Sequence, residues 1–470
     1  MSERKCSVSK KCGGCQLSNM DYARQLKFKQ AMVVKLLRRY CHVNDIIGMS
    51  EPYHYRNKVQ AAIRRAANGR TISGVYQSVN SGIVVTDDCF INDKKANEMI
   101  KYIRERIIKL NIRPYDPKSR RGYIRHIMVR KGHATGDYMA AIVSYSEDVP
   151  EIDTLAKNIA EKYKEVKTVV LCINKSDKLM LGRNEKILYG KGYIEDILCG
   201  RRFRISARSF YQVNPIQTEV LYNTAIEAAK LSGRENILDA YCGTGTIGLC
   251  AANRAKTVLG IEINRDAISD AVVNARLNNI ANADFINGDA AEFMSEAAEN
   301  GERFDVVFAD PPRAGCSRVF LESLITLAPK RVVYISCNPE TLARDMYILT
   351  KGGYKAEMAQ PVDMFPHTRH VETVVLLSRK NIDDHISFTW TDKDFGTKGS
   401  RATYPDIKAY VQDKYDIKVS TLAIAQTKAK CGIIDRENYN KPKSENSKQP
   451  VCTKEKEDAI MDAFRHFKLI

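Results

Sequence analysis

A cysteine stands where a predicted strand meets a predicted helix. The apolar run 331–335 (Arg-Val-Val-Tyr-Ile) indicates a buried parallel strand, and Ser336-Cys337-Asn338 follows it. Asn338 is suited to cap a helix that begins at Pro339, so Cys337 falls between the strand end and the helix N-terminus. Open α/β sheets bind ligands at that edge, and the positive end of a helix dipole favours thiolate over thiol. We therefore expect Cys337 to act as a nucleophile.

Three strands upstream of Cys337 end in residues that could hold a cofactor. Strand 236–241 leads into Cys-Gly-Thr-Gly-Thr246, strand 257–263 carries Glu262 near its end, and strand 304–310 ends in Asp310-Pro-Pro. A strand, a Gly-x-Gly turn and a later acid are also compatible with a dinucleotide. S-adenosylmethionine fits better, because it needs no pyrophosphate cradle, Glu262 can bind its ribose hydroxyls, and the Asp310 loop is expected to face its methyl group.

Closely spaced cysteines open the chain. Cys6, Cys12 and Cys15 form a C-x5-C-x2-C pattern, with Gly13-Gly14 allowing the backbone to wrap closely round a ligand. A fourth ligand is needed, and Cys89 is the nearest candidate that a fold could return. Thiolates at this spacing select zinc or an iron–sulfur cluster, and the spacing leaves both open.

Composition describes a soluble globular chain that stays in the cytoplasm. Of 470 residues, 44% are hydrophobic and 28% charged, without an apolar run of about 18 that would predict a membrane span or an apolar signal region at the N-terminus. Because the cytoplasm keeps thiols reduced, the 13 cysteines indicate metal binding or catalysis before disulfides.

The charge favours a nucleic-acid partner. Lys and Arg number 74 against 56 acids, a net charge of +18. Residues 101–131 hold 11 basic and 2 acidic residues, whereas residues 381–470 are nearly neutral, so we expect the partner surface in the first half. Basic and aromatic side chains that suit looped RNA surround one strand pair here: Arg120, Arg121, Arg125, Arg130, Lys131, Tyr115 and Tyr123. For any one of them the alternative is a solvated surface position.

The hydrophobic pattern divides the chain into four parts. Residues 1–50 hold the cysteines and an amphipathic helix over 21–40, with its apolar residues on one face and a solvated basic face opposite. Residues 51–203 alternate as short strands and predict an antiparallel sheet with helices at 93–111 and 153–163. Residues 204–380 alternate strand and helix and predict a doubly wound α/β sheet closed by a hairpin. Residues 381–470 predict a small helical extension with helices at 404–415, 419–431 and 455–467. Between the last two helices lies a polar stretch over 438–449, in which the region Lys441-Pro442-Lys443 is expected to be a flexible link.

Taken together, these motifs resemble the RNA uracil-5-methyltransferase family over about residues 6–380, most closely the 23S ribosomal RNA members with an N-terminal 4Fe-4S cysteine cluster. The matching motifs are the four cysteines, Tyr55-Arg-Asn-Lys58, Ser209-Phe-Tyr-Gln-Val-Asn214, Asp239–Gly245, Asp310-Pro-Pro-Arg-Ala-Gly315, Ser336-Cys-Asn338 and His370-Val-Glu-Thr373. The resemblance implies a Rossmann-like class I methyltransferase domain that uses S-adenosylmethionine, preceded by an iron–sulfur and β-sheet domain that binds RNA. The N-terminal barrel that many ribosomal members carry has no counterpart in this sequence. The residues beyond 380 have no counterpart in the family pattern.

The resemblance also implies roles for individual residues. Cys337 would be the nucleophile that adds to carbon 6 of uracil, and Glu372 the base that removes the carbon-5 proton after methyl transfer. The methyl-donor positions are Gln212, Tyr241, Thr246, Glu262 and Asp310, with Thr246 standing where the family often has Asn. The substrate positions are Phe210, Asn214 and Arg313, Phe210 being suited to stack on an extruded base. The cluster ligands are Cys6, Cys12, Cys15 and Cys89. His367 and His370 are expected to be structural.

The expected function is methylation of carbon 5 of a uridine in 23S ribosomal RNA, without an obligate protein partner and without a membrane. One alternative is the same chemistry on transfer RNA; the cysteine cluster favours ribosomal RNA. The other is a catalytically inert RNA-binding assembly protein, against which the intact Cys337 and Glu372 argue.

Overall fold

The computed structural model describes residues 6–77, 82–176, 180–182, 184–380, 404–417 and 453–467, together with 419, 423, 424, 427, 430 and 431. Two compact units, Met1–Ile386 and Ser387–Ile470, make up the chain, and each is considered by itself. Among the described helices there is none long and apolar enough to cross a membrane.

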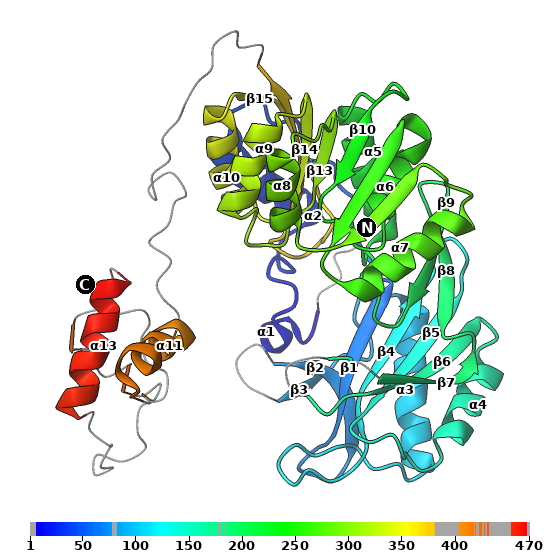
Figure 1. Ribbon diagram of the computed structural model, residues 1–470. Coiled ribbons are helices and arrows are strands. Elements are labelled where there is room, and N and C mark those ends of the chain that lie inside the picture. Colours follow the sequence, from blue (N-terminus) through cyan, green and yellow to red (C-terminus); the bar gives the residue numbers. More distant parts are fainter. Residues whose placement is uncertain are drawn as a thin grey trace. The chain divides into compact units, whose positions relative to one another are not determined.

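The first half of the chain forms a helix-backed sheet followed by a two-stranded ribbon (Figure 1). The elements are α1 Ser9–Cys12, α2 Tyr22–Leu37, β1 Lys58–Arg65, β2 Thr71–Tyr76, β3 Ile83–Val85, α3 Lys94–Lys109, β4 Ile124–Lys131, β5 Tyr138–Ser144, α4 Ile152–Lys162, β6 Val166–Ile173, β7 Asn184–Gly190, β8 Tyr193–Leu198 and β9 Arg201–Ser206. The described strands of the sheet, called here the central sheet, lie in the order β3-β2-β1-β4-β5-β6-β7, and β8 pairs with β9.

The expectation of a purely antiparallel sheet over 51–203 is wrong at one pair of strands. β5 and β6 run parallel, because α4 carries the chain from the end of β5 back to the start of β6. The other neighbouring strands of the central sheet are antiparallel. α3 and α4 bury their apolar stripes in one core with this sheet, including Ile103 of α3 and Leu155 of α4.

The second half forms the doubly wound sheet that the sequence predicts. Its elements are α5 Pro215–Ala228, β10 Asn236–Asp239, α6 Thr246–Ala251, η1 Ala252–Arg254, β11 Thr257–Glu262, α7 Arg265–Leu277, β12 Ala283–Asn287, α8 Ala290–Glu299, β13 Val306–Ala309, α9 Arg318–Leu327, β14 Arg331–Ser336, α10 Pro339–Lys351, β15 Tyr354–Val362 and β16 Glu372–Arg379. The strand order is β12-β11-β10-β13-β14-β16-β15. The first five strands of this order are parallel, while β16 enters antiparallel between β14 and β15.

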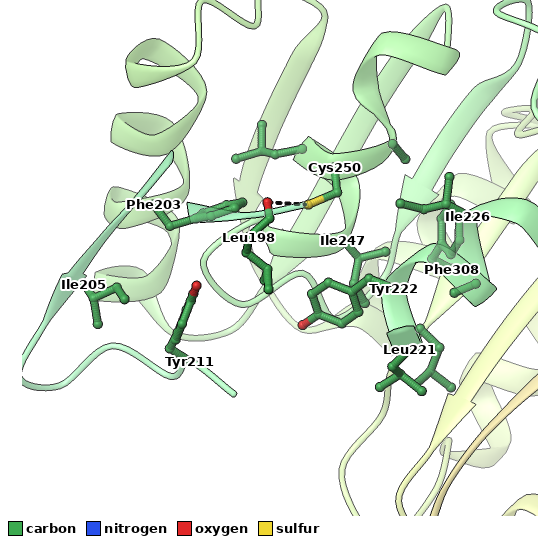
Figure 2. Packing of buried hydrophobic residues seen from close by; sticks show 14 of the residues in the cluster. Leu198, Phe203, Ile205, Tyr211, Leu221, Tyr222, Ile226, Ile247, Cys250 and Phe308 are labelled. Carbon is green, nitrogen blue, oxygen red and sulfur yellow. Dashed lines mark hydrogen bonds between the residues drawn. The ribbon is translucent and has the colours of Figure 1, made fainter. Parts of the chain in front are cut away.

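One hydrophobic core joins the two sheets. It includes Met139 and Val170 of the central sheet and Phe308 of the second sheet, with the ribbon β8–β9 and helix α5 contributing further residues. Figure 2 shows Phe203 of the ribbon and Tyr222 of α5 among the packed side chains. Burial of such large apolar groups stabilises the fold by roughly 1.5–3 kcal/mol for each side chain. The two sheets are therefore held together by packing as well as by the covalent chain.

The second compact unit is a small helical assembly. α11 (Tyr404–Tyr415) and α13 (Lys454–His466) share a core that includes Ile407, Val411 and Phe464. These helices match those expected at 404–415 and 455–467. The polar stretch at 438–449 with its expected link lies outside the described residues, as does most of 419–431.

The N-terminal helix α2 packs on the second sheet with an unexpected face. It contacts α10 and β15, and after it the chain makes isolated bridges between Val43 and Ala359 and between Ile47 and Val362. The buried stripe of α2 consists of Gln25, Lys29, Val33 and Leu37, which are spaced four residues apart. The expectation that all its basic residues are solvated is wrong for Lys29, which is 0% exposed because its ammonium group pairs with Asp363 at 2.5 Å.

The ion pair between Lys29 and Asp363 yields a stability prediction. Replacing Lys29 by Met leaves the Asp363 carboxylate buried without its cation, which should lower the free energy of unfolding by about 3–5 kcal/mol. Urea denaturation measures this loss, and Lys35→Met on the exposed face of α2 is the matched control. A Lys29→Met variant as stable as the Lys35→Met variant would contradict the prediction.

Candidate active site

The register between two strands brings Cys337 and Glu372 together. β14 ends at Ser336 and β16 begins at Glu372, and Ser336 pairs with Thr373 in the antiparallel ladder. Cys337, the first residue after β14, therefore lies beside Glu372. As expected, Asn338 caps α10, with its side-chain oxygen accepting a hydrogen bond from the Glu340 N–H at 3.1 Å.

Burial dominates the ionisation of this pair. It raises the pKa of Glu372 to about 8; Asp310 adds to the rise and Arg313 opposes it. Burial also raises the pKa of Cys337 to about 11, reinforced by Glu372 and Asp310. Burial and two acidic neighbours therefore oppose the thiolate that the helix N-terminus is expected to favour at Cys337, and Arg313 acts in its favour.

The loop between β13 and α9 carries Asp310 and Arg313 and is fixed by buried Asp345. The Asp345 carboxylate accepts hydrogen bonds from the Cys316 N–H at 2.8 Å and from the Tyr334 hydroxyl at 2.6 Å. The Asn338 side chain donates to the Arg313 carbonyl oxygen. Arg313 is exposed and lines a space of about 260 Å³ together with Cys337, Asn338, Arg369 and His370. His370, expected to be structural, thus borders the same space as the thiol.

Acidic side chains gather at the carboxyl ends of β10, β11 and β13. Burial raises the pKa of Asp239 to about 7 and, together with Asp239, that of Asp310 to about 7. One oxygen of Asp239 accepts from the Gly248 N–H, and the other, Oδ1, is buried without a hydrogen-bond partner among the described residues. The Glu262 carboxylate accepts from the N–H groups of Gly243 and Asn264. An acidic edge of this kind is suited to a cationic ligand.

The remaining predicted donor and substrate residues range from packed side chains to an exposed ring. Thr246 begins α6 and exchanges a hydrogen bond with the Tyr222 hydroxyl at 3.1 Å, while Tyr241 packs against Phe320. Gln212 is half-buried, and its carbonyl oxygen accepts from the Asn57 side chain. Phe210 is 67% exposed, as a platform for a base requires.

Asn214 is not placed where it could touch a substrate in this structure. It is 0% exposed, caps α5 through a hydrogen bond from the Gln217 N–H, and donates to the Met364 carbonyl oxygen at 3.0 Å. Because its side-chain groups are engaged inside the protein, Asn214 joins α5 to the segment before β16. The expectation of a substrate contact there is replaced by a structural role.

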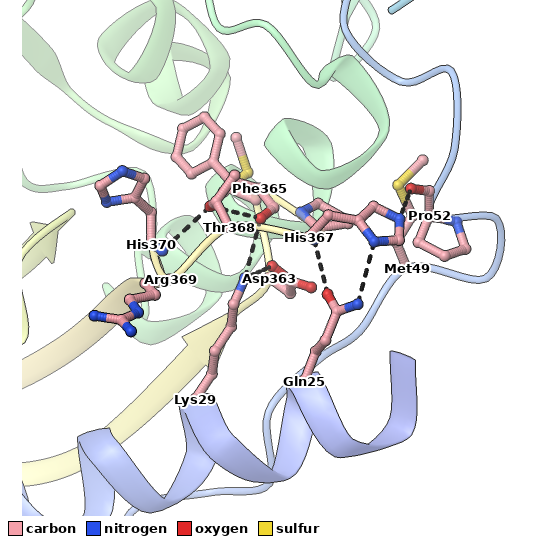
Figure 3. A network of polar contacts seen from close by, with 12 residues as sticks. Gln25, Lys29, Met49, Pro52, Asp363, Phe365, His367, Thr368, Arg369 and His370 are labelled. Atoms are coloured by element: carbon pink, nitrogen blue, oxygen red, sulfur yellow. Dashed lines mark hydrogen bonds and ion pairs between the residues drawn. The ribbon is translucent and has the colours of Figure 1, made fainter. Parts of the chain in front are cut away.

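A polar network that the sequence did not reveal holds the segment leading into Glu372 (Figure 3). Lys29 donates to Asp363 and to the Phe365 carbonyl oxygen, and the Gln25 side chain accepts from the His367 N–H at 2.8 Å. The His367 ring contacts Gln25 and the Pro52 carbonyl oxygen, so its structural role is as expected. The spacing of Gln25, Lys29 and Val33 on one helix face was the signal available in the sequence.

The four N-terminal cysteines lie around one cavity of about 890 Å³. Cys6, Cys12, Cys15 and Cys89 all line it. Burial, then Cys89, Cys12 and Cys6, raises the pKa of Cys15 to about 12, so the four thiols are close enough to influence one another. Within the described residues there is no group of three or more His, Cys, Asp or Glu side chains arranged for a single metal ion.

The basic surface expected near residues 101–131 is partly internal. Arg130 is 1% exposed and donates to the carbonyl oxygens of Ser206 and Ser209, which lowers its value as a phosphate contact. Lys131 pairs with Asp93 at 2.9 Å. Arg120 and Arg121 are exposed. The expected RNA surface therefore loses Arg130, because that side chain ties β4 to the segment after β9.

The parallel sheet with its inserted antiparallel strand, glycine turn and acidic edge defines a Rossmann-like, S-adenosylmethionine-dependent methyltransferase. A family model described as tRNA (Uracil-5-)-methyltransferase matches residues 21–380. The chain belongs to this family, and it is an RNA (uracil-5-)-methyltransferase.

Individual relatives agree with this assignment. An uncharacterized RNA methyltransferase of Listeria innocua is 45% identical over 383 residues, covering 80% of this chain and 84% of that protein. One from Halalkalibacterium halodurans is 44% identical over 385 residues, covering 81% and 84%. The solved tRNA (uracil-54, C5)-methyltransferase of Pyrococcus abyssi, in complex with S-adenosyl-L-homocysteine, is similar with a TM-score of 0.66 and 29% identity, covering 77% of this chain and 85% of that chain.

The proximity of Glu372 to Cys337 predicts a change in thiol reactivity. Glu372 raises the pKa of Cys337, so Glu372→Gln should move the alkylation of Cys337 by iodoacetamide to lower pH. Mass spectrometry of the peptide that contains Cys337 measures the alkylation rate against pH. The exposed Glu340, in the first turn of α10, gives the control Glu340→Gln. Equal profiles for the two variants would show that Glu372 does not act on the thiol.

Proposed function

We propose that this enzyme methylates carbon 5 of a uridine in 23S ribosomal RNA, with Cys337 as nucleophile and Glu372 as base. The observation that carries the proposal is the placement of Cys337 beside the buried Glu372. Carbon 5 of uracil is a poor nucleophile until a thiolate adds to carbon 6. After methylation the carbon-5 proton must pass to a base before the carbon–sulfur bond can break and release the thiolate.

The residues at the carboxyl edge fit S-adenosylmethionine. The unpartnered buried oxygen of Asp239 and the Glu262 carboxylate offer acceptors beside the glycine turn, and we assign donor contacts to Gln212, Tyr241, Thr246, Glu262 and Asp310. The bound donor supplies an electrophilic methyl group on a cationic sulfur. A cation next to Asp310 would lower the pKa values of the neighbouring carboxyls and so favour the ionised form of Glu372 that accepts a proton.

The target uridine is assigned to the open side of this site. Phe210 is exposed and can stack on an extruded base, and Arg313 can bind a phosphate or a uracil oxygen while favouring the thiolate of Cys337. They would hold the base against the thiol without taking part in proton transfer.

The choice of ribosomal RNA rests on the N-terminal cysteines, which resemble those of the 23S-specific members. Transfer RNA is the second candidate, because the similar Pyrococcus abyssi protein is a tRNA methyltransferase. The two substrates require the same chemistry at Cys337 and Glu372, so only an assay on both RNAs distinguishes them.

We further propose that Cys6, Cys12, Cys15 and Cys89 hold a 4Fe-4S cluster. The cavity that they line is roomy, and a four-iron cluster is several atoms wide, so its ligands stand farther apart than those of a single ion. The twelve described cysteines are all free thiols, which fits the reducing cytoplasm as the place where the enzyme acts.

The proposed substrate is tested with transcripts of 23S ribosomal RNA and of transfer RNA. The enzyme with S-adenosylmethionine should form 5-methyluridine in the 23S transcript and not in transfer RNA, as nucleoside mass spectrometry would detect. Cys337→Ala should abolish the product yet keep its affinity for the donor, because the thiol acts on the base. Product in transfer RNA alone would assign the enzyme to the second candidate, and turnover by Cys337→Ala would remove the nucleophile.

Glu372→Gln should stop the reaction after methyl transfer. Without a base the methylated adduct keeps its carbon-5 proton, so a covalent protein–RNA species that survives denaturation should accumulate on gels. Asp310→Asn, which changes another buried carboxyl of the same edge, is the comparison and should not trap the adduct. Normal turnover by Glu372→Gln without the adduct would exclude it as the base.

The cluster is tested by analysis of protein purified without oxygen. We expect about four iron and four sulfide per chain, with loss of both in Cys89→Ser and retention in Cys41→Ser, since Cys41 lies away from the cavity. Stoichiometric zinc in place of iron would contradict the proposal.

A further inference from the structure

A hollow lies on the face of the central sheet that α3 and α4 leave uncovered. Along β1, Val59, Ala61 and Ile63 face the core shared with the two helices, while Gln60, Ala62 and Arg64 alternate to the opposite face. In the ladder, Ala62 pairs with Gly74 of β2 on one side and with His126 of β4 on the other. Strands β2, β1 and β4 lie side by side in the central sheet (Figure 1). Two of the smallest residues, Ala62 and Gly74, meet in the middle of these strands and leave a depression.

Aromatic and basic side chains form the walls of this hollow, which encloses about 570 Å³. Tyr76 is 42% exposed, and the Arg64 guanidinium lies 5.3 Å from the centre of its ring. On the far side, Arg125 lies 5.2 Å from the ring centre of Tyr115. The described lining contains no Asp or Glu, and its charged side chains are the two arginines, Arg64 and Arg125.

Groups that could read the edge of a planar ligand lie among these walls. The Tyr76 hydroxyl shares a hydrogen bond with His126 Nε2 at 3.2 Å, whereas His126 Nδ1 is buried and has no partner in the described part of the chain. Burial, then Arg125 and Arg64, lowers the pKa of His126 to about 4, so the ring is neutral and can both donate and accept. Among the described residues, the Gln60 amide donates only to a weak acceptor, Met128 Sδ at 3.8 Å.

We propose that this hollow binds one unpaired nucleotide of the RNA substrate, separate from the uridine that is methylated. The base would stack on Tyr76, with its edge toward Gln60 and His126, and a phosphate would lie at Arg64 or Arg125. Aromatic rings and arginine planes on an open sheet face are the means by which proteins hold unstacked RNA bases. The hollow shares no lining residue with the space beside Cys337, so it is a second contact with the RNA. The inference rests on the proposed function only in taking RNA as the substrate.

The test separates stacking from charge. Affinity for transcripts of 23S ribosomal RNA and of transfer RNA is measured by fluorescence anisotropy over a range of salt concentrations. Tyr76→Ala should weaken binding of the substrate RNA roughly 5- to 150-fold without changing the salt slope, and Tyr76→Phe should restore most of it because the ring remains. Arg64→Ala should weaken binding and reduce the slope by about one unit.

Two residues of β7 provide matched controls in the same sheet. Tyr189 is 46% exposed, Lys186 is also exposed, and neither lines the hollow. Tyr189→Ala should therefore change RNA affinity less than Tyr76→Ala, and Lys186→Ala less than Arg64→Ala. Each variant is also measured for donor affinity and for kcat and KM. For Tyr76→Ala we expect a raised KM for RNA with kcat kept at saturation, because the hollow holds RNA and does not touch the reacting base.

The outcomes test the nucleotide site independently of the proposed methylation of 23S ribosomal RNA. RNA affinity of Tyr76→Ala equal to that of Tyr189→Ala, with donor affinity intact, would overturn the nucleotide site even if the enzyme methylates 23S ribosomal RNA. Loss of RNA affinity confined to the hollow variants would support the site even if the methylated RNA proves to be transfer RNA. If Tyr76→Phe binds as poorly as Tyr76→Ala, stacking is excluded and the proposal fails.

Discussion

The register of β16 in the sheet is the constraint on which the active site depends. β16 pairs with β14 on one side and β15 on the other, so a shift of one residue would turn Glu372 to the opposite face of the sheet, away from Cys337. The neighbouring apolar residues of β16, among them Val374 and Leu376, are buried in the shared core, which fixes that register. Packing far from the chemistry thus decides which carboxyl meets the thiol.

The site is built at a cost in electrostatic free energy. Burial raises the pKa values of the carboxyls of Asp239, Asp310 and Glu372 to about 7, 7 and 8, and it raises the pKa of the Cys337 thiol to about 11. Such groups cannot all ionise together in a dry environment. Under the proposed function, a cationic donor and Arg313 would relieve this repulsion, so binding of the donor would be linked to activation of Cys337.

The N-terminal segment belongs to this machinery although it lies far away in the sequence. Phe90, next to Cys89, makes an edge contact with the His367 ring at 4.9 Å, and the Leu17 N–H, two residues after Cys15, donates to the His367 carbonyl oxygen at 2.9 Å. Gln25 and Lys29 hold the same segment from α2. The cysteine cavity and the strand that carries Glu372 therefore share one support.

The sequence by itself determined the alternation of strand and helix over 204–380, the strand-to-helix junction at Cys337 and the acids that end the other parallel strands, because these follow from local periodicity and capping. Only the tertiary structure decided that Lys29 and Arg130 are buried, that Asn214 is enclosed, that β5 and β6 run parallel, and that burial raises the pKa of Cys337. Each of these depends on which groups surround a side chain. The desolvation of a side chain and its ion-pair or hydrogen-bond partners are set by residues distant in the chain, so they cannot be predicted from a local sequence pattern.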